Sequence, residues 1–169
     1  MKIKIPLTAA LISSLLLAPS QGALSDSKKL AVLPASGVWL RTPKIPWPDW
    51  QPGHRGLDIA APADTEVFAP IDGNVVWVGR IGKNFGITIK ASAQIKHTIT
   101  GLESPLAIGD KVSRGQFIGW SIISQHCENL DCIHWSVKQN GRYLDPRWLL
   151  KPIVYRLPTP LGGLVHTHF

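Results

Sequence analysis

The chain has no arginine-rich run, no helix-turn-helix pattern and no zinc-finger spacing of cysteines and histidines. A basic chain is attracted to anionic polymers, of which nucleic acid is one and a cell wall another, and the formal net charge here is +7. Without any of these motifs nucleic acid is the weaker partner, and we expect no binding to it. Charged residues make up only 17% of the chain and hydrophobic residues 44%. This composition excludes a disordered class and predicts a buried core.

Long apolar runs are absent except near the N-terminus. Lys2 and Lys4 precede an apolar stretch at residues 5–18, and the small residues Ser20-Gln21-Gly22 follow it. This pattern predicts a secretory signal peptide at residues 1–22, because the stretch is shorter than the roughly 20 residues of a spanning helix. No cysteine lies near the cleavage site, which argues against a lipid anchor there.

Cleavage of the signal would remove two of the 18 basic residues, leaving 16 against 11 acidic ones and a net charge of about +5. We therefore expect a secreted or cell-wall-associated, extracytoplasmic protein. An uncleaved signal that anchors the chain is the alternative, and only then would a membrane be a partner.

Cysteine occurs only twice, at Cys127 and Cys132. In an exported chain the compartment is oxidising, so a local disulfide between these two residues is expected. A metal-binding role for Cys132 is the alternative.

Helical patterns are scarce, and only residues 146–150 predict a helical turn, with Asp145 as its cap and Pro146 at its first position. Short β-rich runs between Gly, Pro, Asn and Asp instead predict an all-β fold, a single antiparallel sheet or barrel-sandwich domain. The length suits one domain. We expect a linker at residues 23–35, the β domain at 36–151 and an extended C-terminal tail at 152–169. The expected strands lie at residues 57–60, 65–68, 74–78, 87–90, 94–98, within 111–120 and at 133–137.

Two distant segments carry residue types that bind zinc. The first, at residues 52–62, contains His54 and Asp58, and the second is Cys132-Ile133-His134-Trp135. Imidazole nitrogens and a carboxylate oxygen are zinc ligands, and three protein ligands leave a fourth position open, as hydrolytic sites require. Surface hydrogen bonding is the alternative role for such His and Asp pairs. Residues two apart in a strand face the same side, so Cys132 lies beside His134.

These segments, with three others, keep their order from about residue 36 to 151. The others are Ala69-Pro70-Ile71-Asp72-Gly73, Gly109-Asp110-Lys111-Val112-Ser113-Arg114-Gly115-Gln116 and Leu144-Asp145-Pro146. Together they resemble the LytM-type (M23) metallopeptidase family. The resemblance implies a β-sheet groove that holds one Zn²⁺ ion through His54, Asp58 and His134 and cleaves peptidoglycan peptides. We expect a monomer.

The chain departs from the family pattern at two histidines that assist the reaction. One is the first histidine of a His-x-His strand, where this chain has Cys132, and a disulfide to Cys127 would prevent its sulfur from replacing an imidazole. The other usually lies some nine residues before the glycine-aspartate turn, where this chain has Thr100-Gly101. His97 lies nearby and is the candidate general base, with a structural strand histidine as the alternative.

Three functions therefore remain open. The first is an M23 endopeptidase whose activity is weakened or lost, since a missing general acid or base typically costs 10²–10⁴-fold in rate. The second is a non-catalytic, degenerate M23 domain that binds peptidoglycan or activates another wall hydrolase. The third is a biotinyl- or lipoyl-like carrier module, but no lysine stands at the required hairpin tip. His126 is expected near the groove mouth, and His166-Thr167-His168 lacks the flanking strand residues of a ligand pair.

Overall fold

The computed structural model describes residues 30–124, 126–127 and 130–151. The predicted signal peptide, the first part of the predicted linker, the predicted tail and His166-Thr167-His168 lie outside these residues. No helix in the described ranges is both long and apolar enough to cross a membrane.

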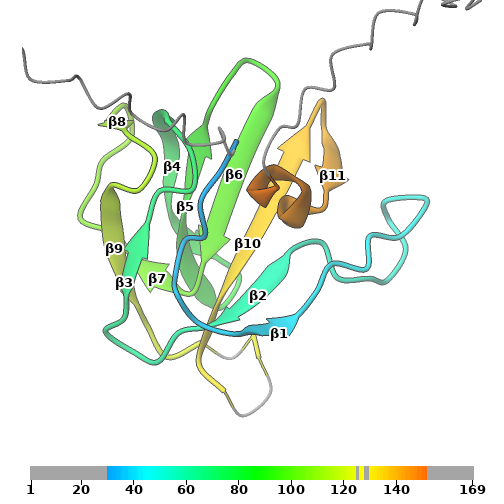
Figure 1. The fold of residues 1–169 in the computed structure, drawn as a ribbon, viewed down its shortest axis with the longest axis horizontal. Coiled ribbons are helices and arrows are strands. Elements are labelled where there is room, and N and C mark those ends of the chain that lie inside the picture. Colours follow the sequence, from blue (N-terminus) through cyan, green and yellow to red (C-terminus); the bar gives the residue numbers. More distant parts are fainter. Residues whose placement is uncertain (1–29, 125, 128–129, 152–169) are drawn as a thin grey trace, which may run out of the picture.

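The predicted all-β fold is confirmed, with antiparallel pairing throughout two sheets (Figure 1). The larger sheet has the order β1-β2-β10-β6-β5-β4-β8, with β11 also paired to β10, and the smaller has the order β3-β9-β7. In the described part of the chain, the 3₁₀ helix Pro146–Leu150 is the one helical element, and Asp145 caps it by accepting from the Arg147 N–H. The strands are β1 (Trp39–Arg41), β2 (Leu57–Ala60), β3 (Glu66–Phe68), β4 (Gly73–Ile81), β5 (Asn84–Lys90), β6 (Ile95–Thr100), β7 (Leu102–Glu103), β8 (Lys111–Val112), β9 (Phe117–Ser121), β10 (Cys132–Gln139) and β11 (Arg142–Leu144).

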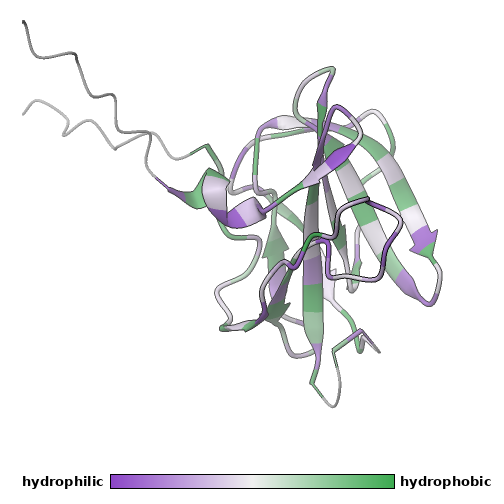
Figure 2. Ribbon diagram, turned by 90° about the vertical axis from the view of Figure 1, so that its right-hand side faces the viewer, coloured by the Kyte–Doolittle hydropathy of each residue, from purple (hydrophilic) through white to green (hydrophobic). Residues whose placement is uncertain are grey.

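The core follows from alternation along the strands, which appears as hydrophobic and hydrophilic bands in Figure 2. Side chains two apart face the same side, and one face of the large sheet is apolar and fully buried. Its residues include Leu57 and Ile59 of β2, Ile87 and Ile89 of β5, Ile99 of β6, and Ile133 and Trp135 of β10. The opposite face of β5, β6 and β10 carries threonine, lysine, serine and histidine, so this face is left for a polar site.

The end of the predicted linker packs onto the domain. Ala31 and Ala35 are buried, and the Ala31 and Val32 N–H groups donate to the Leu149 and Pro70 carbonyls. Residues 30–35 therefore pack against the β domain, and the domain boundary at residue 36 stays a prediction.

Candidate metal centre

The register between β2 and β10 brings Asp58 and His134 together. These residues are directly opposite each other in the antiparallel pair, where Cβ atoms lie roughly 4.5–5.5 Å apart. Their neighbours Leu57, Ile59 and Ile133 fill the core, so Asp58 and His134 must point to the other face. The His134 Nδ1 atom lies 2.6 Å from Asp58 Oδ1.

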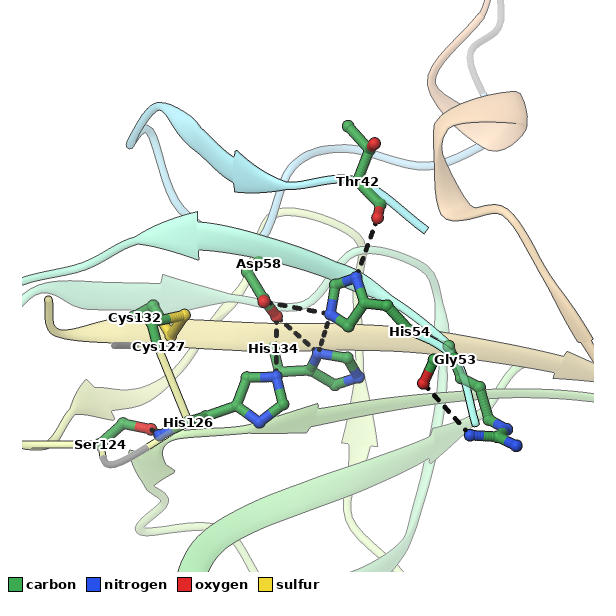
Figure 3. A network of polar contacts seen from close by, with 10 residues as sticks. Thr42, Gly53, His54, Asp58, Ser124, His126, Cys127, Cys132 and His134 are labelled. Atoms are coloured by element: carbon green, nitrogen blue, oxygen red, sulfur yellow. Dashed lines mark hydrogen bonds and ion pairs between the residues drawn. A yellow bond between two sulfur atoms is a disulfide. The ribbon is translucent and has the colours of Figure 1, made fainter. Parts of the chain in front are cut away.

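His54 reaches the same point from the loop before β2. An isolated bridge to Lys44 fixes its backbone through two hydrogen bonds of 2.8 and 3.1 Å. The imidazole Nδ1 donates to the Thr42 carbonyl at 2.9 Å, which leaves the Nε2 lone pair free for a ligand. Nε2 lies 3.1 Å from Asp58 Oδ2 and 3.3 Å from His134 Nδ1 (Figure 3).

The pKa shifts of Asp58 and His134 suit a metal ion. Burial alone would raise the pKa of Asp58, but hydrogen bonds from His126 and His134 and their charges outweigh it and hold that pKa well below its usual range. Burial lowers the pKa of His134, with Asp58 opposing the change. An ionised carboxylate with neutral imidazoles is the state in which these groups bind zinc.

A fourth group completes the cluster. His126 Nε2 lies 3.1 Å from Asp58 Oδ1, and one ligand atom from each of His54, Asp58, His126 and His134 lies within 4.8 Å of the others. The sequence placed His126 only near the groove mouth. The sequence feature that could have placed His126 in the cluster is its position beside Cys127, because a disulfide to Cys132 would draw it toward the strand of His134.

The structure contradicts the assignment of His97 as a general base. His97 is fully buried on the core face of β6, where its Nδ1 accepts a hydrogen bond of 3.2 Å from the Trp135 Nε1–H. Burial lowers its pKa to about 4. His97 and Ile99 are two residues apart in the strand, so both side chains point to the core face, on the far side of the sheet from Asp58. His97 therefore cannot reach a substrate in the groove.

Cys132 does not serve as a substitute for the family histidine either. It is fully buried and joined to Cys127 by a disulfide with an S–S distance of 2.05 Å. A disulfide sulfur carries no proton to transfer and is a poor metal ligand.

A groove of 630 Å³, lined by both polar and apolar side chains, runs from the cluster across the open face of the sheet. Its floor includes Thr88 and Thr98, whose hydroxyls lie 2.9 Å apart. Lys96, Lys138 and Tyr143 also line it, and the Lys138 ammonium lies 4.4 Å from the centre of the Tyr143 ring. A larger cavity of 760 Å³ lies elsewhere, between residues 31–33, Trp39 and the 3₁₀ helix, and none of the four cluster residues lines it.

Gly56 gives His134 the space it occupies. A Cβ atom at this position would lie 2.5 Å from His134 Nε2 and 2.5 Å from the Trp135 carbonyl oxygen. We expect Gly56→Ala to displace the imidazole, to lower zinc affinity at least about tenfold and to reduce the free energy of unfolding by about 1–3 kcal/mol. Zinc titration and urea unfolding test this.

Gly115→Ala is the matched control for Gly56→Ala. A Cβ at residue 115 would meet nothing within 4 Å, although the φ of +80° makes the change costly in stability. Zinc affinity should therefore stay unchanged in this variant. Equal zinc affinities for Gly56→Ala and the unmodified chain would contradict the packing argument.

The comparisons with known proteins agree with this architecture. The model of peptidase family M23 matches residues 52–146, from the His54 loop into the 3₁₀ helix. The uncharacterized protein Rv2891 of Mycobacterium tuberculosis is 28% identical over 116 residues, which cover 65% of this chain and 46% of that protein. The chain thus spans about half the length of this relative.

Solved structures share the fold. A putative M23 peptidase from Pseudomonas aeruginosa superposes with a TM-score of 0.60 at 24% identity, covering 76% of this chain and 53% of its own. A zinc-containing peptidase from Vibrio cholerae superposes with a TM-score of 0.59 at 21% sequence identity. The match covers 75% of this chain and 40% of that chain. The third structure is the catalytic domain of the prophage-encoded M23 protein EnpA from Enterococcus faecalis, solved as a point mutant. It superposes with a TM-score of 0.55 at 25% sequence identity, and the match covers 65% of this chain and 88% of that chain.

Proposed function

Because this chain belongs to peptidase family M23, we propose that it binds one zinc ion through His54, Asp58 and His134 and cleaves peptide bonds in peptidoglycan, at a rate below that usual for the family. The observation that carries the proposal is the convergence of these three residues, distant in sequence, within 4.8 Å at one end of a groove. M23 peptidases act in general on peptidoglycan peptides at the cell wall. The predicted signal peptide would deliver this chain to that location.

The residues of the cluster fit zinc. All three are typical zinc ligands, and His54 and Asp58 are almost completely buried. The Thr42 carbonyl fixes the His54 tautomer, as partners of metal-bound histidines commonly do. Zinc in such a site supplies Lewis-acid activation of water and of a peptide carbonyl.

The groove supports an extended peptide as the substrate. Its floor on β5 and β6 offers hydroxyl groups, and Lys96 and Lys138 line the same space. These cations suit carboxylate groups of a peptide. The charge of the chain favours an anionic polymer in the same way.

The low rate follows from the two missing assistants. His97 faces the core and Cys132 is bonded to Cys127, so neither can move a proton in the groove. A positioned acid or base typically raises the rate of reaction 10²–10⁴-fold, and we expect the rate of this chain to be lower by this factor.

The same two residues favour a second candidate function, a degenerate M23 domain that binds peptidoglycan or activates another wall hydrolase. Digestion of purified peptidoglycan, with released peptides separated by mass spectrometry, decides between the two. We expect slow release of peptides by the chain, and none by His134→Ala or in the presence of a chelator. Retention on insoluble wall without any release would support the second function instead.

A further inference from the structure

His126 enters the cluster on the side opposite His54. Its Nε2 lies 3.1 Å from Asp58 Oδ1, the oxygen that also contacts His134 Nδ1 at 2.6 Å. The imidazole is edge-on to His134, with ring centres 4.6 Å apart, and its centre lies 5.9 Å from that of His54. Figure 3 shows all three rings directed at the one carboxylate.

Most of the spacings between these atoms approach those of a tetrahedral zinc site, while the 2.6 Å between His134 Nδ1 and Asp58 Oδ1 is shorter than the separation of two ligand atoms on one ion. Ligand atoms about 2.0–2.2 Å from a zinc ion lie roughly 3.3–3.6 Å from one another. The His126–Asp58 distance of 3.1 Å is close to this value, as are the His54–Asp58 distance of 3.1 Å and the His54–His134 distance of 3.3 Å. His126 therefore stands where a ligand would, within reach of the same ion.

Three contacts hold the His126 backbone in this position. The adjacent Cys127 is tied by the disulfide to Cys132, which lies two residues before His134 on the same face of β10. The His126 N–H donates to Ser124 Oγ at 3.2 Å, and Ser124 is itself buried. The Leu130 N–H closes the loop by donating to the Cys127 carbonyl at 3.3 Å.

We propose that His126 is a fourth protein ligand of the zinc ion and that the Cys127–Cys132 disulfide positions it. This inference rests on the proposed function, because it concerns the same ion. Four protein ligands make a closed site, whereas hydrolysis needs an open position. His126 thus occupies the place that a substrate or water would take in an open site.

Cobalt in place of zinc tests this assignment without an activity assay. The visible absorption of the Co²⁺-loaded chain is recorded while acetohydroxamate, a small chelating ligand for an open metal position, is added. We expect His126→Ala to bind Co²⁺ at least tenfold more weakly than the unmodified chain. We also expect its spectrum to shift at acetohydroxamate concentrations at least tenfold lower.

Two further variants complete the experiment. Cys127→Ala/Cys132→Ala keeps all four ligands but frees the loop, and its acetohydroxamate sensitivity should move toward that of His126→Ala. Leu130→Ala, an exposed change in the same loop, should behave like the unmodified chain.

The outcomes separate the inference from the proposed function. Equal Co²⁺ affinities and equal acetohydroxamate sensitivities for the unmodified chain and His126→Ala would overturn the fourth-ligand assignment and leave His126 as a neighbour of an open site. The disulfide's part would be overturned if the double cysteine variant matched the unmodified chain. Failure of the unmodified chain to bind any Co²⁺ would overturn the proposed function itself.

Discussion

Asp58→Asn is expected to lower the affinity for zinc more than 100-fold. Asp58 is 2% exposed and contacts His54, His126 and His134 at 3.1, 3.1 and 2.6 Å. The substitution keeps the shape of the side chain but removes its negative charge, and an amide is a far weaker zinc ligand. Residues that merely support a ligand already cost 10–100-fold when mutated, so loss of a ligand should exceed that. Competition with a fluorescent zinc chelator measures the effect.

Asp64→Asn is the matched control for Asp58→Asn. Asp64 is exposed and lies in the turn between β2 and β3, and asparagine tolerates its φ of +67° equally well. The control should bind zinc like the unmodified chain. If Asp58→Asn also kept that affinity, the carboxylate could not be a ligand.

The stability of the metal-free chain is expected to fall by about 3 kcal/mol between pH 7 and pH 4 because of His97 alone. Burial lowers the pKa of His97 from 6.5 to about 4. Below pH 6.5 the unfolded chain therefore takes up a proton that the folded chain excludes, and stability decreases as the pH falls, until the folded chain also binds the proton near pH 4. Each pKa difference of one corresponds to 1.36 kcal/mol, which gives the stated size.

His97→Leu should remove this part of the pH dependence. The variant has no titrating group at residue 97, and the side chains on the other face of the sheet are unchanged. Its stability at pH 7 will also change, because the Trp135 Nε1–H loses its acceptor. The decisive quantity is the slope of stability against pH, from urea unfolding at several pH values. Identical slopes for both chains would show that His97 is not buried as a neutral imidazole.

Much of the fold could be predicted from local pattern. The expected strand at residues 57–60 matches β2, and the expected runs at 133–137 and 94–98 lie mostly within β10 and β6. The register could not be predicted, because the pairing of Asp58 with His134 joins residues far apart in sequence. Only the resemblance to the family indicated that these residues meet.

The sequence suggested a catalytic role for His97 that the structure contradicts, and it placed His126 near the groove without indicating its contact with Asp58. His97 lies two residues before Ile99 in β6, so strand alternation already indicated that its side chain points to the core face. His126 carries no strand pattern, and its approach to Asp58 depends on the path of a loop that the disulfide closes. The position of His126 beside Cys127 indicates that it lies near the strand of His134, but the sequence does not give its distance from Asp58.

We infer that His54, Asp58 and His134 converge on a single zinc ion. X-ray diffraction from crystals of the zinc-loaded chain, recorded on both sides of the zinc absorption edge, tests it most directly. We expect one anomalous peak per chain, about 2.0–2.2 Å from a nitrogen of each imidazole and an oxygen of Asp58. A chain that shows no peak between these three side chains, or a peak held by other residues, would contradict it.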